Sequence, residues 1–143
     1  MSRRVLIVAL AAVFLAALAA VGFAVTRQDG AAISAAELGA KPFTPEAFAA
    51  AKATGKPVLV DVFAPWCPTC RAQRPILLEL SKDPKFKDLI ILEVDFDSQK
   101  EALRALKVQS QSTLIVFKGA EEKARSVGDT RKPSIEALLA KAL

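Results

Sequence analysis

A strand-like run that ends in two closely spaced cysteines constrains this chain more than any other feature. Residues 58–64, Val-Leu-Val-Asp-Val-Phe-Ala, are almost all apolar and rich in β-branched side chains. They lead directly into residues 66–70, Trp-Cys-Pro-Thr-Cys, which hold both cysteines of the chain. A Cys-x-x-Cys pair between a strand and a helix places one thiol where it ionises easily, so the pattern indicates thiol–disulfide chemistry.

Residues 28–40 are polar and small and resemble a linker, and capping signals and hydrophobic periodicity predict alternating helices and strands after them. The strands at 57–64, 89–96 and 113–117 are joined through helices, and a β-α-β unit places its strands in parallel, whereas the tight turn at 118–120 pairs the last two strands antiparallel. The expected fold class is α/β, with a central mixed sheet and helices on both faces. The other predicted elements are a helix from Thr44 to Gly55, a helix at 67–81 kinked at Pro75, a helix at 98–106 capped by Ser98, an edge strand at 123–127 with a bulge at Gly128, and a last helix capped by Ser134.

The N-terminal segment is predicted to meet a membrane. Residues 5–25 carry no charge, and Arg3 and Arg4 precede them. A helix needs about 20 apolar residues to cross a bilayer, which favours an uncleaved transmembrane anchor over a removed signal peptide with cleavage options at 17–19 or 20–22. A buried helix of the folded domain is disfavoured because the run is not amphipathic. The expected organisation is an anchor or signal at 1–27, a linker at 28–40 and a domain at 41–143.

Either export reading places the domain on the far side of the membrane, because the arginine pair stays in the cytoplasm. In a bacterium that is the periplasm or the cell exterior. Without cleavage the protein stays in the inner membrane through residues 5–25, and after cleavage it is secreted or periplasmic. The compartment is oxidising, so a cysteine pair kept reduced there needs a membrane electron donor.

Composition excludes several other classes of function. The chain contains no histidine, so Cys-His and Ser-His nucleophile pairs are impossible. A four-coordinate zinc site would need Cys67 and Cys70 from two chains. The net charge of +5 comes without a basic stretch interleaved with aromatics, which argues against nucleic-acid binding. We expect a monomer with no cofactor and no resident metal.

The chain resembles the thioredoxin family from Lys41 to its C-terminus. The Trp-Cys-x-x-Cys motif, Pro75 five residues beyond the second cysteine, Asp61 inside the preceding strand and the strand at 113–117 carry this resemblance. It implies a thioredoxin-like three-layer fold and thiol–disulfide exchange.

The residues themselves predict distinct roles for the two thiols. Cys67 falls at a helix N-terminus, where free N–H groups and the helix dipole favour its thiolate. We therefore expect Cys67 to react with the partner and the more buried Cys70 to resolve the mixed disulfide. A purely structural disulfide is the alternative, but a bond that closes so short a loop removes little chain entropy.

Asp61 is the third candidate catalytic residue. Burial of a carboxyl group in an apolar strand raises its pKa, and the resemblance implies that this acid takes the proton of the resolving thiol. The alternative is a buried polar residue without a catalytic role, or an acid paired with a lysine. Glu93 stands where relatives often carry a lysine, and a second acid close by would raise the pKa of Asp61 further.

Ser112 stands where relatives carry a proline in a cis peptide bond. A cis bond before serine costs about 2.5–4 kcal/mol, so we expect a trans bond here. The resemblance implies that the loop of Gln111, Ser112 and Thr113 binds the backbone of the partner, and the Ser112 hydroxyl could donate to the Cys67 thiolate. Neutral drift at this position is the alternative.

Three residues of the motif complete the predicted partner contacts. Trp66 shields the pair and touches the partner, and Pro68 and Thr69 tune the redox couple without adding a cation. Relatives with Cys-Pro-Thr-Cys include membrane-tethered reductants of cytochrome c maturation. The sequence therefore predicts an exported oxidoreductase that reduces disulfides of other exported proteins. The alternatives are an oxidase that forms disulfides and a non-catalytic module that docks a partner or a metal.

Overall fold

The computed structural model describes residues 33–143, and its strands form one mixed sheet in the order β1-β3-β2-β4-β5. β2 runs parallel to β3, and β3 runs parallel to β1. β4 is antiparallel to β5, as the tight turn between them predicts. It is also antiparallel to β2, so the connection from β3 to β4 does not give the parallel strand that the β-α-β rule predicted. The strands are β1 (Lys41–Pro42), β2 (Pro57–Phe63), β3 (Ile90–Asp95), β4 (Thr113–Lys118) and β5 (Glu121–Val127).

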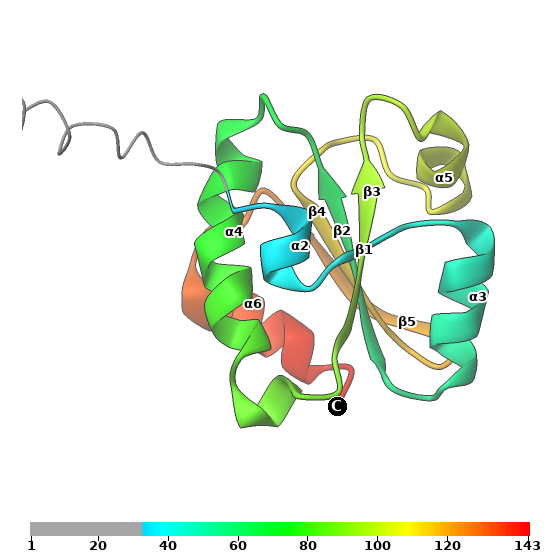
Figure 1. Ribbon diagram of the computed structural model, residues 1–143, viewed down its shortest axis with the longest axis vertical. Coiled ribbons are helices and arrows are strands. Elements are labelled where there is room, and N and C mark those ends of the chain that lie inside the picture. Colours follow the sequence, from blue (N-terminus) through cyan, green and yellow to red (C-terminus); the bar gives the residue numbers. More distant parts are fainter. Residues whose placement is uncertain (1–32) are drawn as a thin grey trace, which may run out of the picture. The chain divides into compact units, whose positions relative to one another are not determined.

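Helices cover both faces of this sheet, which confirms the predicted three-layer α/β fold (Figure 1). α2, α4 and α6 pack on one face, and α3 and α5 pack on the other. The helices are α2 (Ala35–Leu38), α3 (Pro45–Ala53), α4 (Pro68–Ser81), the 3-10 turn η1 (Pro84–Phe86), α5 (Lys100–Ala105) and α6 (Lys132–Ala140). Thr44 caps α3 with its side chain, as predicted.

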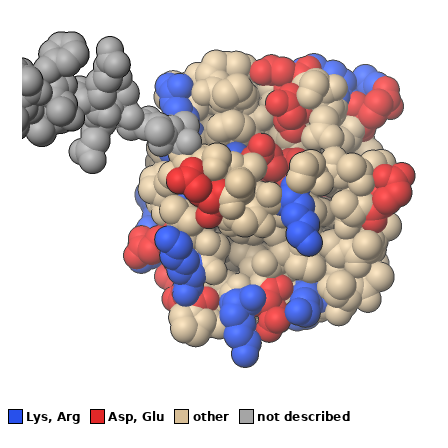
Figure 2. Space-filling model, in the orientation of Figure 1, with Lys and Arg blue, Asp and Glu red and all other residues tan. Residues whose placement is uncertain are grey.

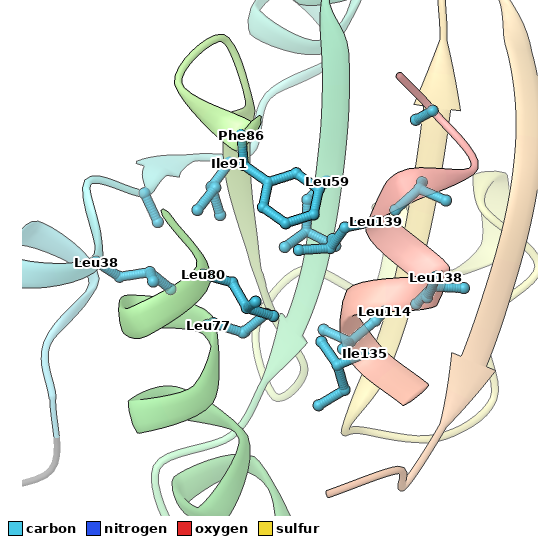
Figure 3. Close-up of a cluster of buried hydrophobic side chains, with 13 residues drawn as sticks. Leu38, Leu59, Leu77, Leu80, Phe86, Ile91, Leu114, Ile135, Leu138 and Leu139 are labelled. Atoms are coloured by element: carbon cyan, nitrogen blue, oxygen red, sulfur yellow. The ribbon is translucent and has the colours of Figure 1, made fainter. Parts of the chain in front are cut away.

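The core on the α4 and α6 face is formed by side chains from the sheet and from the helices that cover it (Figure 3). Leu59 of β2 and Leu114 of β4 meet the apolar faces of the two helices. Burying a leucine stabilises the fold by about 1.5–3 kcal/mol, so this cluster holds α4 firmly against the sheet. The members from the two long helices are Leu77 and Leu80 of α4 and Ile135, Leu138 and Leu139 of α6.

The alternation of side chains along β2 decides which residue lies beneath α4. Val58, Val60 and Val62 point to the α3 and α5 face, where they join a second core. The residues between them, Leu59 and Asp61, therefore face α4. This alternation brings the single acid of the strand under the helix that carries the cysteines.

The predicted linker is wrong over its last residues, since the folded part begins before Lys41. Ser34 caps α2 and exchanges hydrogen bonds with Glu37 in a capping box. Leu38 is only 3% exposed and joins the core on the α4 face. Because α2 packs on this core, residues 35–40 belong to the folded domain. The predicted anchor or signal at 1–27 lies outside the described residues.

Two predicted caps are also wrong. Ser98 donates its hydroxyl to Asp95, and α5 begins later, at Lys100, without a side-chain cap. Ser134 lies inside α6, which begins at Lys132 because Pro133 supplies a helical φ in the first turn.

The predicted bulge at Gly128 is wrong as well. The irregularity in the β4–β5 pairing lies between Val116 and Phe117. Gly128 has a φ of 72° and donates its N–H to the carbonyl of Ser112. Gly128 therefore helps to hold the loop beside the cysteines. Its positive φ is one that glycine adopts readily.

Charge on the face drawn in Figure 2 is of mixed sign, with basic and acidic side chains interspersed. Among residues 33–143, no helix combines the length and the apolar character that crossing a bilayer requires.

Candidate active site

The cysteine pair lies where β2 passes into α4, as predicted. Cys67 is the N-cap of α4, and Pro68 occupies the first helical position, which suits its fixed φ. The N–H of Cys70 donates to Cys67 Sγ at 3.3 Å. Cys67 is 2% exposed and Cys70 1%, and both are free thiols. A sulfur thus performs the capping role that a serine or aspartate oxygen usually has, and its thiolate gains from the helix dipole.

Ser112 faces both sulfurs from the loop before β4. Its Oγ lies 3.2 Å from Cys67 Sγ and 3.2 Å from Cys70 Sγ. The described residues contain no cis peptide bond, so the bond before Ser112 is trans, as predicted. Ser112 has a φ of 59°, in the left-handed region that is uncommon for residues other than glycine. The hydroxyl is therefore in place to donate to a thiolate, as expected from the sequence.

The backbone of Ser112 is held on both sides by the fold. Its N–H donates to the carbonyl of Val62 at 2.9 Å, which continues the pairing of β2 with β4. Its carbonyl accepts the N–H of Gly128 at 2.9 Å and Nε2 of Gln73 at 3.3 Å. Gln73 is a buried residue of α4 that also donates to the carbonyl of Asp129 at 2.9 Å. These bonds leave the Ser112 main chain no free group for a partner.

The two thiols ionise differently. Burial raises the pKa of Cys67, but hydrogen bonds from the Ser112 hydroxyl and from the N–H groups of Cys70 and Thr69 outweigh it and lower the pKa to about 7. Burial raises the pKa of Cys70, and the neighbouring Cys67 raises it further, against hydrogen bonds from Ser112 and Ala64. Because the thiolate is the reactive form of a cysteine, these pKa shifts favour Cys67 over Cys70 as the nucleophile at neutral pH.

A buried ionic cluster lies beneath the helix. Asp61 and Arg74 are buried together under α4, and Arg74 Nη1 lies 3.7 Å from Asp61 Oδ2. Arg74 Nη2 also pairs closely with Glu93 of β3, and its guanidinium stacks 4.0 Å from the ring centre of Phe63. Among residues 33–143, Asp61 Oδ2 and Arg74 Nε and Nη1 have no hydrogen-bond partner. No hydrogen bond joins Asp61 to either thiol in this part of the chain.

Arg74 is the site residue that sequence reasoning missed. Burial raises the pKa of Asp61 to about 6, Arg74 opposes the rise, and Glu93 adds to it, as expected for a second acid close by. Arg74 follows Cys70 by four residues and precedes Leu77 by three, which places it on the buried stripe of the helix. A charged residue in that stripe, facing a strand that carries an acid, was the available signal.

The predicted partner contacts divide into exposed and buried residues. Trp66 is 54% exposed, and its Nε1 donates to Asp97 Oδ2 at 2.7 Å. Pro68 is exposed, and Thr69 and Gln111 are half-buried. Thr113 is buried, and its hydroxyl donates to the carbonyl of Ser110 at 2.6 Å. In residues 33–143 no group of three or more cysteine or acidic side chains is arranged to hold a metal ion.

A mixed sheet flanked by helices, with an ionisable dithiol at a helix N-terminus, defines a thiol–disulfide oxidoreductase of thioredoxin-like fold. Comparison with known proteins agrees. The sequence model of the thioredoxin family matches residues 39–141. The chain belongs to the thioredoxin family, and it is a thioredoxin-like thiol–disulfide oxidoreductase.

Individual relatives and a solved structure are similar to this chain over about two thirds of its length. The chain is 40% identical to a thioredoxin of Chlamydia trachomatis, over 67% of this chain and 91% of that protein. It is 39% identical to a thioredoxin H-type of Brassica campestris, over 64% of this chain and 72% of that protein. The crystal structure of Trxlp from Edwardsiella tarda is similar with a TM-score of 0.67 and 43% identity, covering 68% of this chain and 95% of that one.

Proposed function

We propose that this protein is a membrane-anchored reductant that opens disulfide bonds in other exported proteins. The observation that carries the proposed direction is the environment of Cys67. Its thiolate is stabilised by neutral groups, a hydroxyl and backbone N–H groups, and its pKa is about 7. Reducing thioredoxins have a nucleophile pKa of about 7, whereas strongly oxidising pairs reach about 3.5 because their reduced form is much more stabilised.

The proposed reaction has two steps. The Cys67 thiolate attacks a disulfide of the partner, which forms a mixed disulfide and releases one partner thiolate. Cys70 then attacks Cys67 Sγ, which forms the Cys67–Cys70 disulfide and releases the second partner thiolate. Asp61 accepts the proton of Cys70, a role supported by its pKa of about 6 and its place under α4.

The proposed partner surface surrounds Cys67. Trp66, Pro68 and Thr69 lie on the helix side of the pair, and Gln111 lies on the loop side. The Ser112 main chain is already hydrogen-bonded within the fold, so backbone pairing with a partner falls to Gln111. Ser112 and Thr113 then form the floor of the surface. We propose that the protein works as a monomer, with no cofactor.

The proposed location rests on the sequence of the N-terminal segment. Residues 5–25 are uncharged and follow Arg3 and Arg4, which favours an anchor with the domain outside the cytoplasm. An oxidising compartment returns the pair to the disulfide form, so the proposal includes a membrane electron donor that reduces it again.

The reduction potential tests the direction. Equilibration of the full chain with glutathione buffers should give a value near about −270 mV for a reductant, and a value near about −120 mV would identify an oxidase. Insulin reduction by the full chain should be lost in Cys67→Ser. Equal rates for both proteins would instead identify a binding module without redox activity.

Two further measurements test location and partners. A C-terminal alkaline phosphatase fusion should be active with residues 1–27 and inactive without them, because that enzyme needs an oxidising compartment for its disulfides. An inactive full-length fusion contradicts export. A Cys70→Ser variant should stall as mixed disulfides, and the proteins bound to it should be exported ones.

A further inference from the structure

The Ser112 hydroxyl has an unusual position, equidistant from the two reacting atoms. Its Oγ lies 3.2 Å from each of Cys67 Sγ and Cys70 Sγ. A serine hydroxyl has one hydrogen to donate and two lone pairs that accept. It can therefore donate to only one sulfur at a time while it accepts from the other. In the reduced protein the Cys67 thiolate can only accept, so the hydroxyl donates to Cys67, and Cys70 Sγ is the second acceptor within reach.

The fold leaves the hydroxyl hydrogen as the movable part of this residue. Ser112 is 3% exposed, and its main chain is held by Val62, Gly128 and Gln73. Rotation of the O–H bond therefore redirects the hydrogen bond from one sulfur to the other while the oxygen stays in place. A proline side chain has no hydroxyl, so serine at the position where relatives carry proline adds a hydrogen-bond donor to the site.

We propose that Ser112 is a catalytic residue whose hydroxyl serves the two sulfurs in turn, Cys67 during attack and Cys70 during resolution. This inference rests on the two-step use of the cysteines proposed above. Once Cys67 is bonded to a partner sulfur it carries no negative charge, and the hydroxyl loses its anionic acceptor. When Cys70 gives up its proton, the hydroxyl turns and donates to the new thiolate.

The second step balances without a further reactant. The Cys70 thiolate supplies the electron pair of the new Cys70–Cys67 bond, and the bond between Cys67 and the partner sulfur breaks. Its electron pair leaves with the partner sulfur, which becomes a thiolate and takes up a proton. The two enzyme thiols are oxidised to a disulfide, and the partner disulfide is reduced to two thiols. The hydroxyl of Ser112 changes its hydrogen-bond acceptor and is not consumed.

The proposal predicts that loss of the hydroxyl slows resolution more than attack. Removing a hydrogen bond to a charged group corresponds to about one pKa unit or more. At pH 7 Cys70 is mostly protonated, so its thiolate population falls about tenfold, and the higher nucleophilicity of the more basic thiolate leaves a net loss of about threefold or more. Cys67 is about half ionised at that pH, so attack slows only about twofold.

A small aromatic disulfide separates the two steps. The reduced full chain is mixed with an equimolar amount of dithiobis(nitrobenzoate), and the coloured thiol is followed by stopped flow. Its first release reports attack by Cys67, and its second reports resolution by Cys70. The test variants are Ser112→Ala, which removes only Oγ, and Ser112→Gly, which also suits the φ of 59° and decides the matter if the alanine variant does not fold. Ser110→Ala, an exposed serine of the same loop, is the matched control.

In both Ser112 variants we expect the second phase to slow about threefold or more at pH 7 and the first phase to slow about twofold. In Ser110→Ala we expect both phases to keep the rates of the unaltered protein. The deficit in the second phase should shrink as the pH rises, because Cys70 then ionises without help. A second phase equal to that of the unaltered protein overturns the proposal, as does a deficit that is the same at every pH. An oxidising potential or an inactive phosphatase fusion would overturn the proposed direction or location while both phases stay measurable, so the two failures are distinguishable.

Discussion

Two sets of polar side chains meet at α4, one neutral and one charged, and the comparison between them predicts different effects on the stability of the protein. On the loop side, Ser112 and Gln73 are neutral, and the Ser112 main chain is fully hydrogen-bonded. On the sheet side, Asp61 and Arg74 are charged and buried, and several of their polar atoms lack a hydrogen-bond partner within the described residues.

The two sides therefore respond differently to pH. A neutral hydrogen bond contributes the same free energy at any pH in the working range, about 0.5–1.5 kcal/mol. A buried carboxylate instead costs free energy whenever it is ionised, and that cost appears as a raised pKa. The neutral hydrogen bonds that hold Gln73 and the Ser112 main chain keep their strength as the pH changes, whereas the charged side can exchange a proton only because its ionised form is destabilising.

The largest effect is expected for Arg74→Met. The substitution keeps the length of the side chain but leaves Asp61 and Glu93 without their cation. Breaking a buried ion pair costs about 3–5 kcal/mol, so the free energy of unfolding at pH 7 should fall by that amount. Denaturant unfolding measures it. The loss should shrink as the pH is lowered to 5, because Asp61 then takes up a proton in the folded state.

Arg71→Met is the matched control for this variant. Arg71 lies on the same helix but is exposed, and its Nη1 donates to the carbonyl of Pro65. Its loss should change stability by less than about 0.5 kcal/mol. Equal effects of the two arginine substitutions would contradict the distinction drawn between the buried cluster and the rest of α4.

Asp61→Asn should give the next largest effect, with the opposite sign at neutral pH. The folded pKa of about 6 lies above the unfolded value of 3.8, so between these values the folded protein holds a proton that the unfolded chain has released. The stability of the unaltered protein therefore falls as the pH rises from about 4 to 6.

The asparagine variant lacks this fall and should be more stable by about 2–3 kcal/mol at pH 7. Unfolding at a series of pH values measures the difference. The same variant should resolve mixed disulfides more slowly, since the proton acceptor is gone. A stability of the unaltered protein that rises between pH 4 and 6 would contradict the raised pKa.

Gln73→Met probes the neutral side and should have the smallest effect. The variant loses the hydrogen bonds to the carbonyls of Ser112 and Asp129, although Ser112 keeps the N–H of Gly128. Stability should fall by about 1 kcal/mol, equally at pH 5 and pH 8. A pH-dependent loss would show that the loop side is coupled to the ionic cluster beneath α4.

The parts of the fold that the sequence predicted well are those with strong local patterns. The apolar runs of β2, β3 and β4 identify buried strands, and the alternation of strands and helices implies the mixed sheet. Cys67 and Ser112 could be placed because each is tied to a strand end. The trans bond before Ser112 could be predicted because a cis bond before any residue other than proline is costly.

The parts that were missed depend on partners distant in the sequence or on weak local signals. β1 has only two residues and exists because it pairs with β3. α2 does carry a capping box at Ser34 and Glu37, but its four residues are too few for a periodic pattern. The role of Arg74 becomes clear only in the folded protein, where α4 packs over Asp61 and brings the two charges together. The starts of α5 and α6 depend on competing hydrogen bonds to Asp95 and Asp129.

Because Cys67 Sγ is both the reacting atom and the cap of α4, the helix registers the oxidation state of the pair. A thiolate that accepts the Cys70 N–H protects that amide from solvent, and a disulfide sulfur is a much poorer acceptor. Oxidation should therefore loosen the first turn of α4 and speed amide hydrogen exchange there, while Leu77 and Leu80 keep the rest of the helix protected. The surface of the protein then differs slightly between the two states. A partner or an electron donor could use this difference to distinguish the reduced protein from the oxidised one.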